Sequence, residues 1–96
     1  MNIVIIGTGY VGLVTGVGLA SLGNAVTFID LDIEKINKLS NKSLPFYEPG
    51  LDKHFEDKKT FENMQFVSKY SEVDWDDKDI VFICVQTPNN IETNSV

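Results

Sequence analysis

Apolar residues in the chain form short runs and helical spacings that glycine, asparagine and polar segments separate. Residues 2–6 are a β-branched run, which is typical of a strand buried on both faces. Residues 10–22 carry apolar side chains at helical spacing, and Gly23-Asn24 ends the predicted helix. Ala25–Asp30 is a second apolar run. The order strand, glycine turn, helix, strand predicts two parallel strands joined by a right-handed crossover.

The remaining sequence alternates between amphipathic and fully apolar segments. In chain order it predicts a helix over 32–40, a loop over 41–50, a short helix over 51–58, a strand within 61–67, centred on 64–67, a polar connection over 71–78 and a strand over 79–85. The last strand is apolar at six consecutive positions, which suits a central strand of a parallel sheet. We expect residues 1–88 to be ordered and the polar, Asn-rich residues 89–96 to form a mobile tail.

Composition narrows the possible partners. The chain has 96 residues, enough for one compact unit. Its net charge is −6, with 8 lysines, no arginine and 14 acidic residues, which disfavours nucleic acid. A dinucleotide would therefore be held by local backbone groups. The single cysteine, Cys84, excludes an intrachain disulfide, and no apolar stretch has the length of a membrane span. We expect the N-terminal segment not to be a signal peptide, because it lacks a basic region before its apolar run. We expect no membrane partner and a cytoplasmic location.

The strongest motif is Gly7-Thr8-Gly9-Tyr10-Val11-Gly12, a G-x-G-x-x-G pattern between the first strand and the first helix. In such a motif Gly7 permits the tight turn, Gly9 lets a diphosphate approach the backbone, and Gly12 lets the helix pack close to the sheet. The N–H groups and dipole of the first helical turn favour the anion. The motif in this context predicts the N-terminal portion of a Rossmann-type, doubly wound α/β fold with a parallel sheet. The alternative is a set of ordinary turn glycines.

Asp30 lies at the end of the second predicted strand, 23 positions after Gly7. An acidic residue at this distance accepts hydrogen bonds from the adenosine ribose hydroxyls. Its carboxylate also repels a 2′-phosphate, and the chain has no arginine to bind one. The predicted cofactor is therefore NAD rather than NADP.

Two further residues are candidate cofactor contacts. Lys35, one turn into the second helix, is close enough to Asp30 to reach the same ribose, and the alternative is a solvated helix face. Thr87 follows the last strand at its carboxyl end, where open α/β sheets bind ligands. The alternative for Thr87 is a simple strand-ending turn.

Other chemically capable residues are interpreted structurally. His54 has no triad partner and is expected on a helix surface. Cys84 lies in an apolar strand, where a thiol is an inert core residue. The acidic run from Asp74 to Asp79 lacks the glycine and final glutamate of an EF-hand loop, so we expect a solvated loop, with Trp75 covering the core edge. We predict no catalytic residue and no metal ligand in this chain.

The sequence resembles the N-terminal NAD-binding domain of the nucleotide-sugar dehydrogenases. This family acts on UDP-glucose, GDP-mannose and UDP-N-acetyl-sugars. The resemblance covers essentially the whole chain, and the second motif below makes it more specific than the glycine pattern alone. The matching segments are Gly7–Leu13, Asp30, Lys35-Ile36, Pro45-Phe46-Tyr47-Glu48-Pro49-Gly50-Leu51 and Thr87-Pro88.

The resemblance implies oxidation of UDP-glucose to UDP-glucuronate in two NAD-dependent steps. It places the cysteine nucleophile and the UDP-sugar pocket beyond position 96, and it implies a homodimer. The chain would then be a fragment, inactive alone, in which Gly7–Gly12, Asp30, Lys35 and Thr87 contact NAD. The resemblance gives Glu48 no role.

Two positions of the sequence depart from the family pattern. The family often has glycine where Lys42 stands and a small residue where Gln86 stands.

One alternative is a stand-alone dinucleotide-binding or regulatory module. Another is an NAD enzyme for a different sugar, or for a hydroxyacid, that shares the first strand, helix and strand. The Tyr47–Leu51 run favours the nucleotide-sugar family over a hydroxyacid dehydrogenase.

Overall fold

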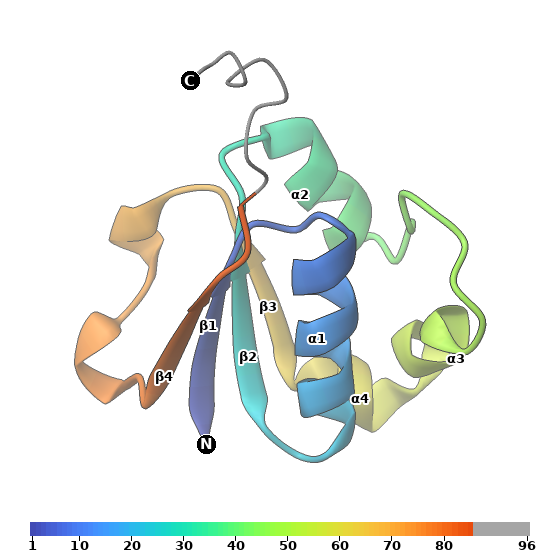
Figure 1. Ribbon diagram of the computed structural model, residues 1–96, viewed down its shortest axis with the longest axis horizontal. Helices are drawn as coiled ribbons and strands as arrows, with labels where there is room; N and C mark the ends of the chain where they lie inside the picture. The colour runs from blue at the N-terminus through green and yellow to red at the C-terminus, as the bar shows by residue number, and fades with distance from the viewer. Residues whose placement is uncertain (86–96) are drawn as a thin grey trace, which may run out of the picture.

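The computed structural model describes residues 1–85, which fold as a parallel sheet covered on one face by helices (Figure 1). Thr87 and Gln86, and the predicted boundary between an ordered segment and a tail, lie outside the described residues. The elements in chain order are β1 (Asn2–Ile6), α1 (Tyr10–Ser21), β2 (Ala25–Ile29), α2 (Ile33–Ser40), α3 (Leu51–Glu56), α4 (Lys58–Glu62), β3 (Met64–Val67), the 3₁₀ turns η1 (Tyr70–Glu72) and η2 (Trp75–Asp77), and β4 (Ile80–Ile83).

The four strands are all parallel and lie in the order β3-β2-β1-β4. The α/β fold with a parallel sheet is therefore confirmed. The first strand, helix and strand match the predicted ranges to within one residue at each end. Backbone N–H groups of Gly7 and Cys84 donate to β2 and β1, at 2.8 Å each, so the loop after β1 is held between the ends of its two neighbours.

The main core lies between the sheet and the helices. It contains alternate residues of the strands, such as Ile3, Ile5 and Phe28, and the inner faces of α1 and α3. Phe28 stacks on Phe66 with ring centroids 5.0 Å apart. The Phe28 ring also lies directly against α1 at Gly16. A Cβ added at Gly16 would collide with this ring, so a glycine is needed at that position of the helix. These contacts fix the distance between α1 and β2, and hence the position of the loop that joins β1 to α1.

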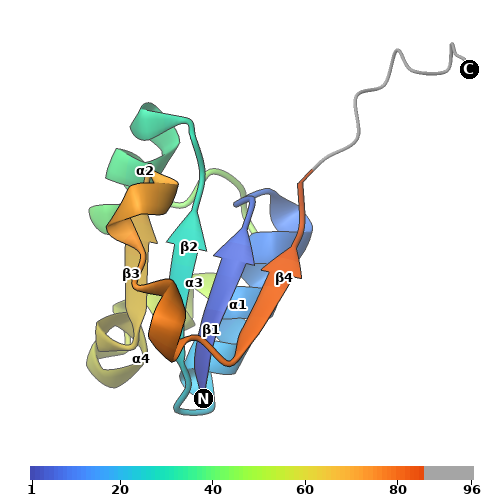
Figure 2. The same ribbon diagram turned by 90° about the vertical axis from the view of Figure 1, so that its left-hand side faces the viewer.

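The opposite face of the sheet is covered by the connection that carries η1 and η2 (Figure 2). Val73 from this connection packs against Val4, Ile29 and Val67 in a second, smaller core. Trp75 was expected to cover the core edge, but it is 40% exposed and stacks on Tyr70, which precedes it in the same connection. Val73, with a smaller and fully apolar side chain, is the residue that inserts.

The single helix predicted over residues 51–58 is wrong. The expected helix over 51–58 breaks at Asp57, whose carboxylate accepts from the N–H of Thr60 at 2.9 Å and starts α4 instead. The helix α4 runs to Glu62, and β3 follows at Met64–Val67, so the third strand predicted there is confirmed. An aspartate cap satisfies a free N–H of the new helix, so the break stabilises α4.

The described residues supply one neighbour of the last strand, so its expected central position stays a prediction. Within residues 1–85, β4 pairs only with β1 and lies at the edge of the sheet. Its apolar run reflects two different surroundings. Phe82 is partly buried against the main core, whereas Val81 and Ile83 are 44% and 73% exposed on the other face.

Candidate dinucleotide-binding site

A cleft of about 590 Å³ lies at the carboxyl ends of β1, β2 and β4. Its walls come from the glycine loop, from the residues that follow β2, and from the 3₁₀ connection. The lining residues are Ile6, Gly7, Thr8, Gly9, Tyr10, Val11, Ile29, Asp30, Leu31, Lys35, Tyr70, Cys84 and Val85. The structure thus brings together every predicted site residue that it describes except Gly12, which is buried behind the loop.

Gly7 and Gly12 are required by the protein's own packing. Gly7 has a φ of +101°, and a Cβ added there would lie 2.9 Å from the backbone carbon of Cys84. A Cβ on Gly12 would collide with the Gly7 carbonyl oxygen. These two positions therefore form the tight turn and the close helix contact that the motif predicts.

Gly9 has neither of these reasons to be glycine. Its φ and ψ of −73° and −169° suit any residue, and an added Cβ would meet no atom within 4 Å. The residue caps α1, which has no side-chain cap hydrogen bond. The first helix bond back to Gly9 comes from the N–H of Leu13, at 2.9 Å. The earlier N–H groups, including those of Tyr10 and Val11 in the cleft wall, have no partner within the helix, so this end of the cleft is suited to an anion.

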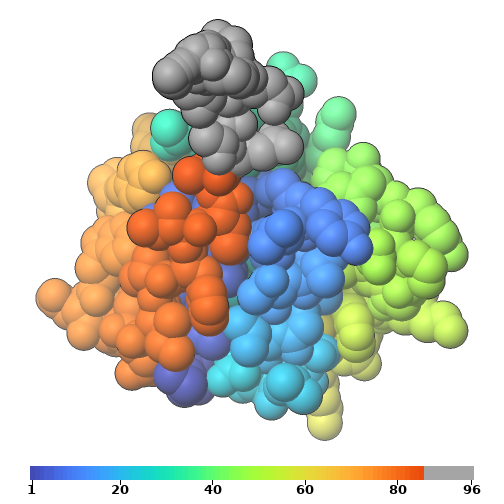
Figure 3. All heavy atoms as spheres, viewed as in Figure 1, coloured from blue at the N-terminus to red at the C-terminus, as the bar shows by residue number. Residues whose placement is uncertain are grey.

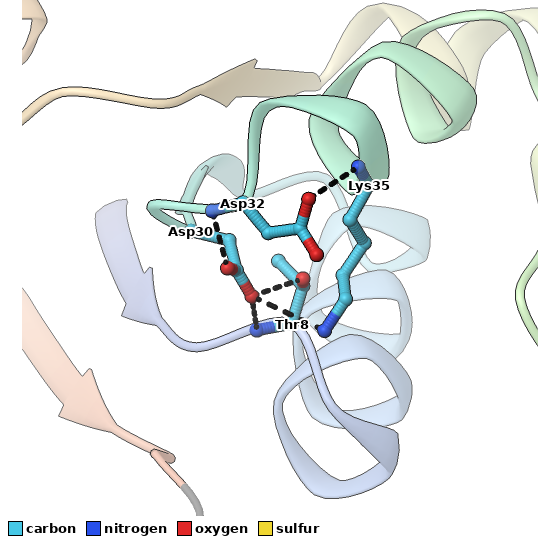
Figure 4. A network of polar contacts seen from close by, with 4 residues as sticks. All are labelled: Thr8, Asp30, Asp32 and Lys35. Carbon is cyan, nitrogen blue, oxygen red and sulfur yellow. Dashed lines mark hydrogen bonds and ion pairs between the residues drawn. The ribbon is translucent and has the colours of Figure 1, made fainter.

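Asp30 is held at the other end of the cleft by a network of donors (Figure 4). The N–H and the hydroxyl of Thr8 donate to its Oδ2 at 3.1 and 2.7 Å. The N–H of Asp32 donates to its Oδ1 at 3.0 Å, and Lys35 Nζ lies 3.5 Å from Oδ2. Oδ1 accepts a single hydrogen bond in this network and so keeps room for a second donor.

The network keeps Asp30 ionised. Partial burial acts to raise the pKa of its carboxyl, but the hydrogen bonds from Asp32 and Thr8 and the charge of Lys35 outweigh burial and hold the pKa below its ordinary value. The carboxylate is only 18% exposed, whereas Lys35 is 35% exposed. A negative charge in a fixed orientation at this position accepts hydroxyl donors and repels phosphate.

Six wall residues were not predicted as site residues: Ile6, Ile29, Leu31, Tyr70, Cys84 and Val85. Three of them are exposed. Tyr70 lines the cleft from η1, and Leu31 and Val85 line it from the ends of β2 and β4. All three are largely exposed, at 45%, 70% and 60%. Only the fold brings Tyr70 to the cleft, but the position of Leu31 directly after Asp30 was a usable signal. Cys84, predicted as core, is half-buried and also lines the cleft.

The other predicted residues lie outside the cleft. His54 is exposed on α3, as expected for a surface helix residue. Within residues 1–85 no three His, Cys, Asp or Glu side chains are grouped to hold a metal ion. In the same part of the chain, no helix has the length and apolar character needed to cross a membrane.

Comparisons with known proteins agree with this geometry. The family profile described as "UDP-glucose/GDP-mannose dehydrogenase family, NAD binding domain" matches residues 1–96. The chain is 47% identical over 89 residues to a UDP-glucose 6-dehydrogenase of Rickettsia bellii, which is 93% of the chain and 20% of that relative. It is 44% identical over 88 residues to a UDP-glucose 6-dehydrogenase of Bacillus subtilis, which is 92% of the chain and 20% of that protein.

Solved structures of nucleotide-sugar dehydrogenases also match this chain. A ternary complex of GDP-mannose dehydrogenase from Pseudomonas aeruginosa matches with a TM-score of 0.81 and 32% identity, over 92% of this chain and 20% of that one. A UDP-N-acetyl-mannosamine dehydrogenase from Staphylococcus aureus matches with a TM-score of 0.78 and 32% identity, over 94% and 20%. The chain thus spans about a fifth of the length of the relatives it matches.

Proposed function

The chain belongs to the UDP-glucose/GDP-mannose dehydrogenase family as its NAD-binding domain, and on this premise we propose that the cleft at the glycine loop holds the NAD. In this assignment Gly7–Gly12 surround the diphosphate, Asp30 and Lys35 hold the adenosine ribose, and Thr87 contacts the cofactor from beyond β4. Bound NAD supplies a hydride acceptor. The observation that carries the assignment is Gly9, which lines the cleft and at which an added Cβ would meet no protein atom, so steric crowding within the protein does not require glycine there.

The diphosphate is assigned to the first turn of α1. Free N–H groups of Tyr10 and Val11 lie in the cleft wall, and the helix dipole adds a favourable interaction with an anion. Each hydrogen bond to a charged acceptor contributes about 1.5–3 kcal/mol. Such local interactions exceed the diffuse repulsion from a net charge of −6, which physiological salt screens within about 8 Å.

The ribose is assigned to Asp30. Its fixed, ionised carboxylate has a free acceptor position on Oδ1, and its charge opposes the 2′-phosphate of NADP. Lys35 neutralises part of this charge and lies within reach of the same hydroxyls. The apolar side chains of Leu31, Tyr70 and Val85 are the natural wall for the adenine ring, because they line the same cleft and are largely exposed without a ligand.

We further propose that the whole protein oxidises UDP-glucose to UDP-glucuronate in two NAD-dependent steps. The support is the identity of 47% and 44% to the two enzymes of that name above. On this proposal the 96 residues bind NAD without oxidising a sugar, and UDP-sugar contacts and catalytic residues belong to other parts of the protein. The cytoplasmic location and the homodimer implied by the resemblance belong to the same proposal.

Calorimetric titration of this chain with NAD, NADP and UDP-glucose tests the assignment. We expect NAD to bind, NADP to bind more weakly, and UDP-glucose to show no heat of binding. Asp30→Asn should weaken NAD binding and reduce the preference over NADP. The control is Asp52→Asn, which removes the same charge from an exposed position of α3 outside the cleft. Tight binding of UDP-glucose, or unchanged affinities in Asp30→Asn, would contradict the proposal.

A further inference from the structure

The segment over residues 41–50, which the proposed function leaves without a role, lies against the first turn of α1. The hydroxyl of Tyr10 donates to Oε1 of Glu48 at 2.9 Å. The Tyr10 ring also contacts Phe46, with centroids 5.4 Å apart and planes at 42°. Figure 3 shows the exposed start of α1 in blue, between β4 on one side and the green atoms of this segment and α3 on the other.

Glu48 is presented by an anchored turn. On one side, Leu44 and Phe46 pack against the main core. On the other, the N–H of Leu51 donates to the Glu48 carbonyl at 3.0 Å, and the Leu51 side chain is only 5% exposed. Gly50 between them has a φ of +91°, which lets the chain turn directly into α3. The carboxylate of Glu48 therefore has a defined position relative to α1.

Tyr10 connects this turn to the cofactor cleft. It is the first residue of α1, it lines the cleft, and its N–H is one of the free donors assigned to the diphosphate. Its side chain is 55% exposed, so core packing alone does not hold it. The hydrogen bond to Glu48 and the charge of Glu48 raise the pKa of Tyr10, so its hydroxyl stays a donor.

We infer that the hydrogen bond from Tyr10 to Glu48 is a latch that fixes the first turn of α1 for the diphosphate, which makes Glu48 a positioning residue for NAD. The latch acts through geometry, because Glu48 lies outside the cleft lining and its negative charge would itself repel the diphosphate. This inference rests on the proposed cofactor site. It gives one residue of the Pro45–Leu51 motif, Glu48, a role in cofactor binding.

Charge and geometry are separated by comparing variants of equal charge. Tyr10→Phe keeps the ring and removes the donor. It should raise the Kd for NAD about 3–10-fold, which is the effect of losing one partly exposed hydrogen bond. Glu48→Ala and Glu48→Gln both remove the charge, but only Gln keeps an acceptor. Glu48→Ala should therefore bind NAD about 3–10-fold more weakly than Glu48→Gln. The double variant Tyr10→Phe, Glu48→Ala should bind no more weakly than Glu48→Ala alone.

The matched controls are Tyr47→Phe and Glu56→Ala, since both residues are exposed and lie outside the cleft lining. Both should bind NAD as the wild type does. If Tyr10→Phe leaves the Kd unchanged and lowers only the midpoint of thermal unfolding, the contact is structural and the inference is wrong. Tighter NAD binding by Tyr10→Phe would overturn it as well, because the bond would then compete with the cofactor. A wild-type protein that does not bind NAD would refute the proposed function instead.

Discussion

Replacing Gly9 with alanine should separate cofactor binding from stability. The added Cβ meets no protein atom within 4 Å, and the backbone angles are allowed for alanine. Alanine has less conformational entropy than glycine in the unfolded chain, which stabilises the folded state by about 0.4–1 kcal/mol. Alanine is also a poorer N-cap than glycine, which destabilises the folded state by a similar amount. The two effects oppose each other, so we expect the free energy of unfolding to change by less than about 1 kcal/mol.

Binding should respond quite differently. On the proposed assignment, the new methyl group would occupy space that the diphosphate needs and would keep its oxygens from the N–H groups of the first turn. Losing one hydrogen bond to a charged acceptor costs about 1.5–3 kcal/mol, which is about a 10- to 150-fold increase in the Kd for NAD. Chemical denaturation measures the first quantity, and calorimetric titration with NAD measures the second.

Gly18→Ala is the matched control for this experiment. Gly18 is also a glycine of α1 at which an added Cβ meets nothing, but it lies inside the helix and outside the cleft lining. Alanine there should stabilise the protein by about 0.5–1 kcal/mol and leave NAD binding unchanged. If Gly9→Ala binds NAD as tightly as the wild type does, the diphosphate does not approach residue 9 and the assignment of the cleft is wrong.

Two further predictions concern stability. Because the pKa of Asp30 is lowered by folding, its ionised form adds stability that is complete above the unfolded pKa, about 3.9, and is lost as pH falls through the folded value. The free energies of unfolding of wild type and Asp30→Asn, measured by chemical denaturation, should therefore differ at pH 7, and the difference should shrink below about pH 4. A difference that stays constant with pH would refute the role of the charge. Lys42 has a φ of 64° and a cation–π contact 4.8 Å from the Phe61 ring centroid. Lys42→Gly relieves about 1 kcal/mol of strain and loses about 0.5–1 kcal/mol of cation–π attraction, so it should match the wild type, whereas Lys42→Ala, which loses only the attraction, should melt lower than both.

Local sequence was sufficient for the glycine loop and its strands. The run over residues 2–6 and the glycines at 7, 9 and 12 constrain the backbone over short distances, so the predicted turn, helix and second strand are confirmed. Asp30 was placed by its distance from Gly7, and the structure brings it to the same cleft. The role of each predicted residue toward NAD stays a prediction.

Features that depend on tertiary proximity were missed. Glu48 is 38 residues from Tyr10, and no spacing rule connects them. Tyr70 reaches the cleft only because its connection crosses the second face of the sheet. The strand order β3-β2-β1-β4 of residues 1–85 is a tertiary feature that an apolar run does not encode. The break at Asp57 was the exception, since an aspartate three residues before Thr60 is a recognisable cap.

The pairing of β1 with β4 has a consequence for synthesis of the protein. Ile3 lies in register with Ile80, so β1 obtains one of its two neighbours only after the chain has been translated as far as β4. At about 5–20 residues per second, the intervening 77 positions take roughly 4–15 s to translate. During this time one edge of β1 is open to other nascent chains. Slowing translation over residues 6–80 should therefore lower the soluble yield more than slowing it afterwards.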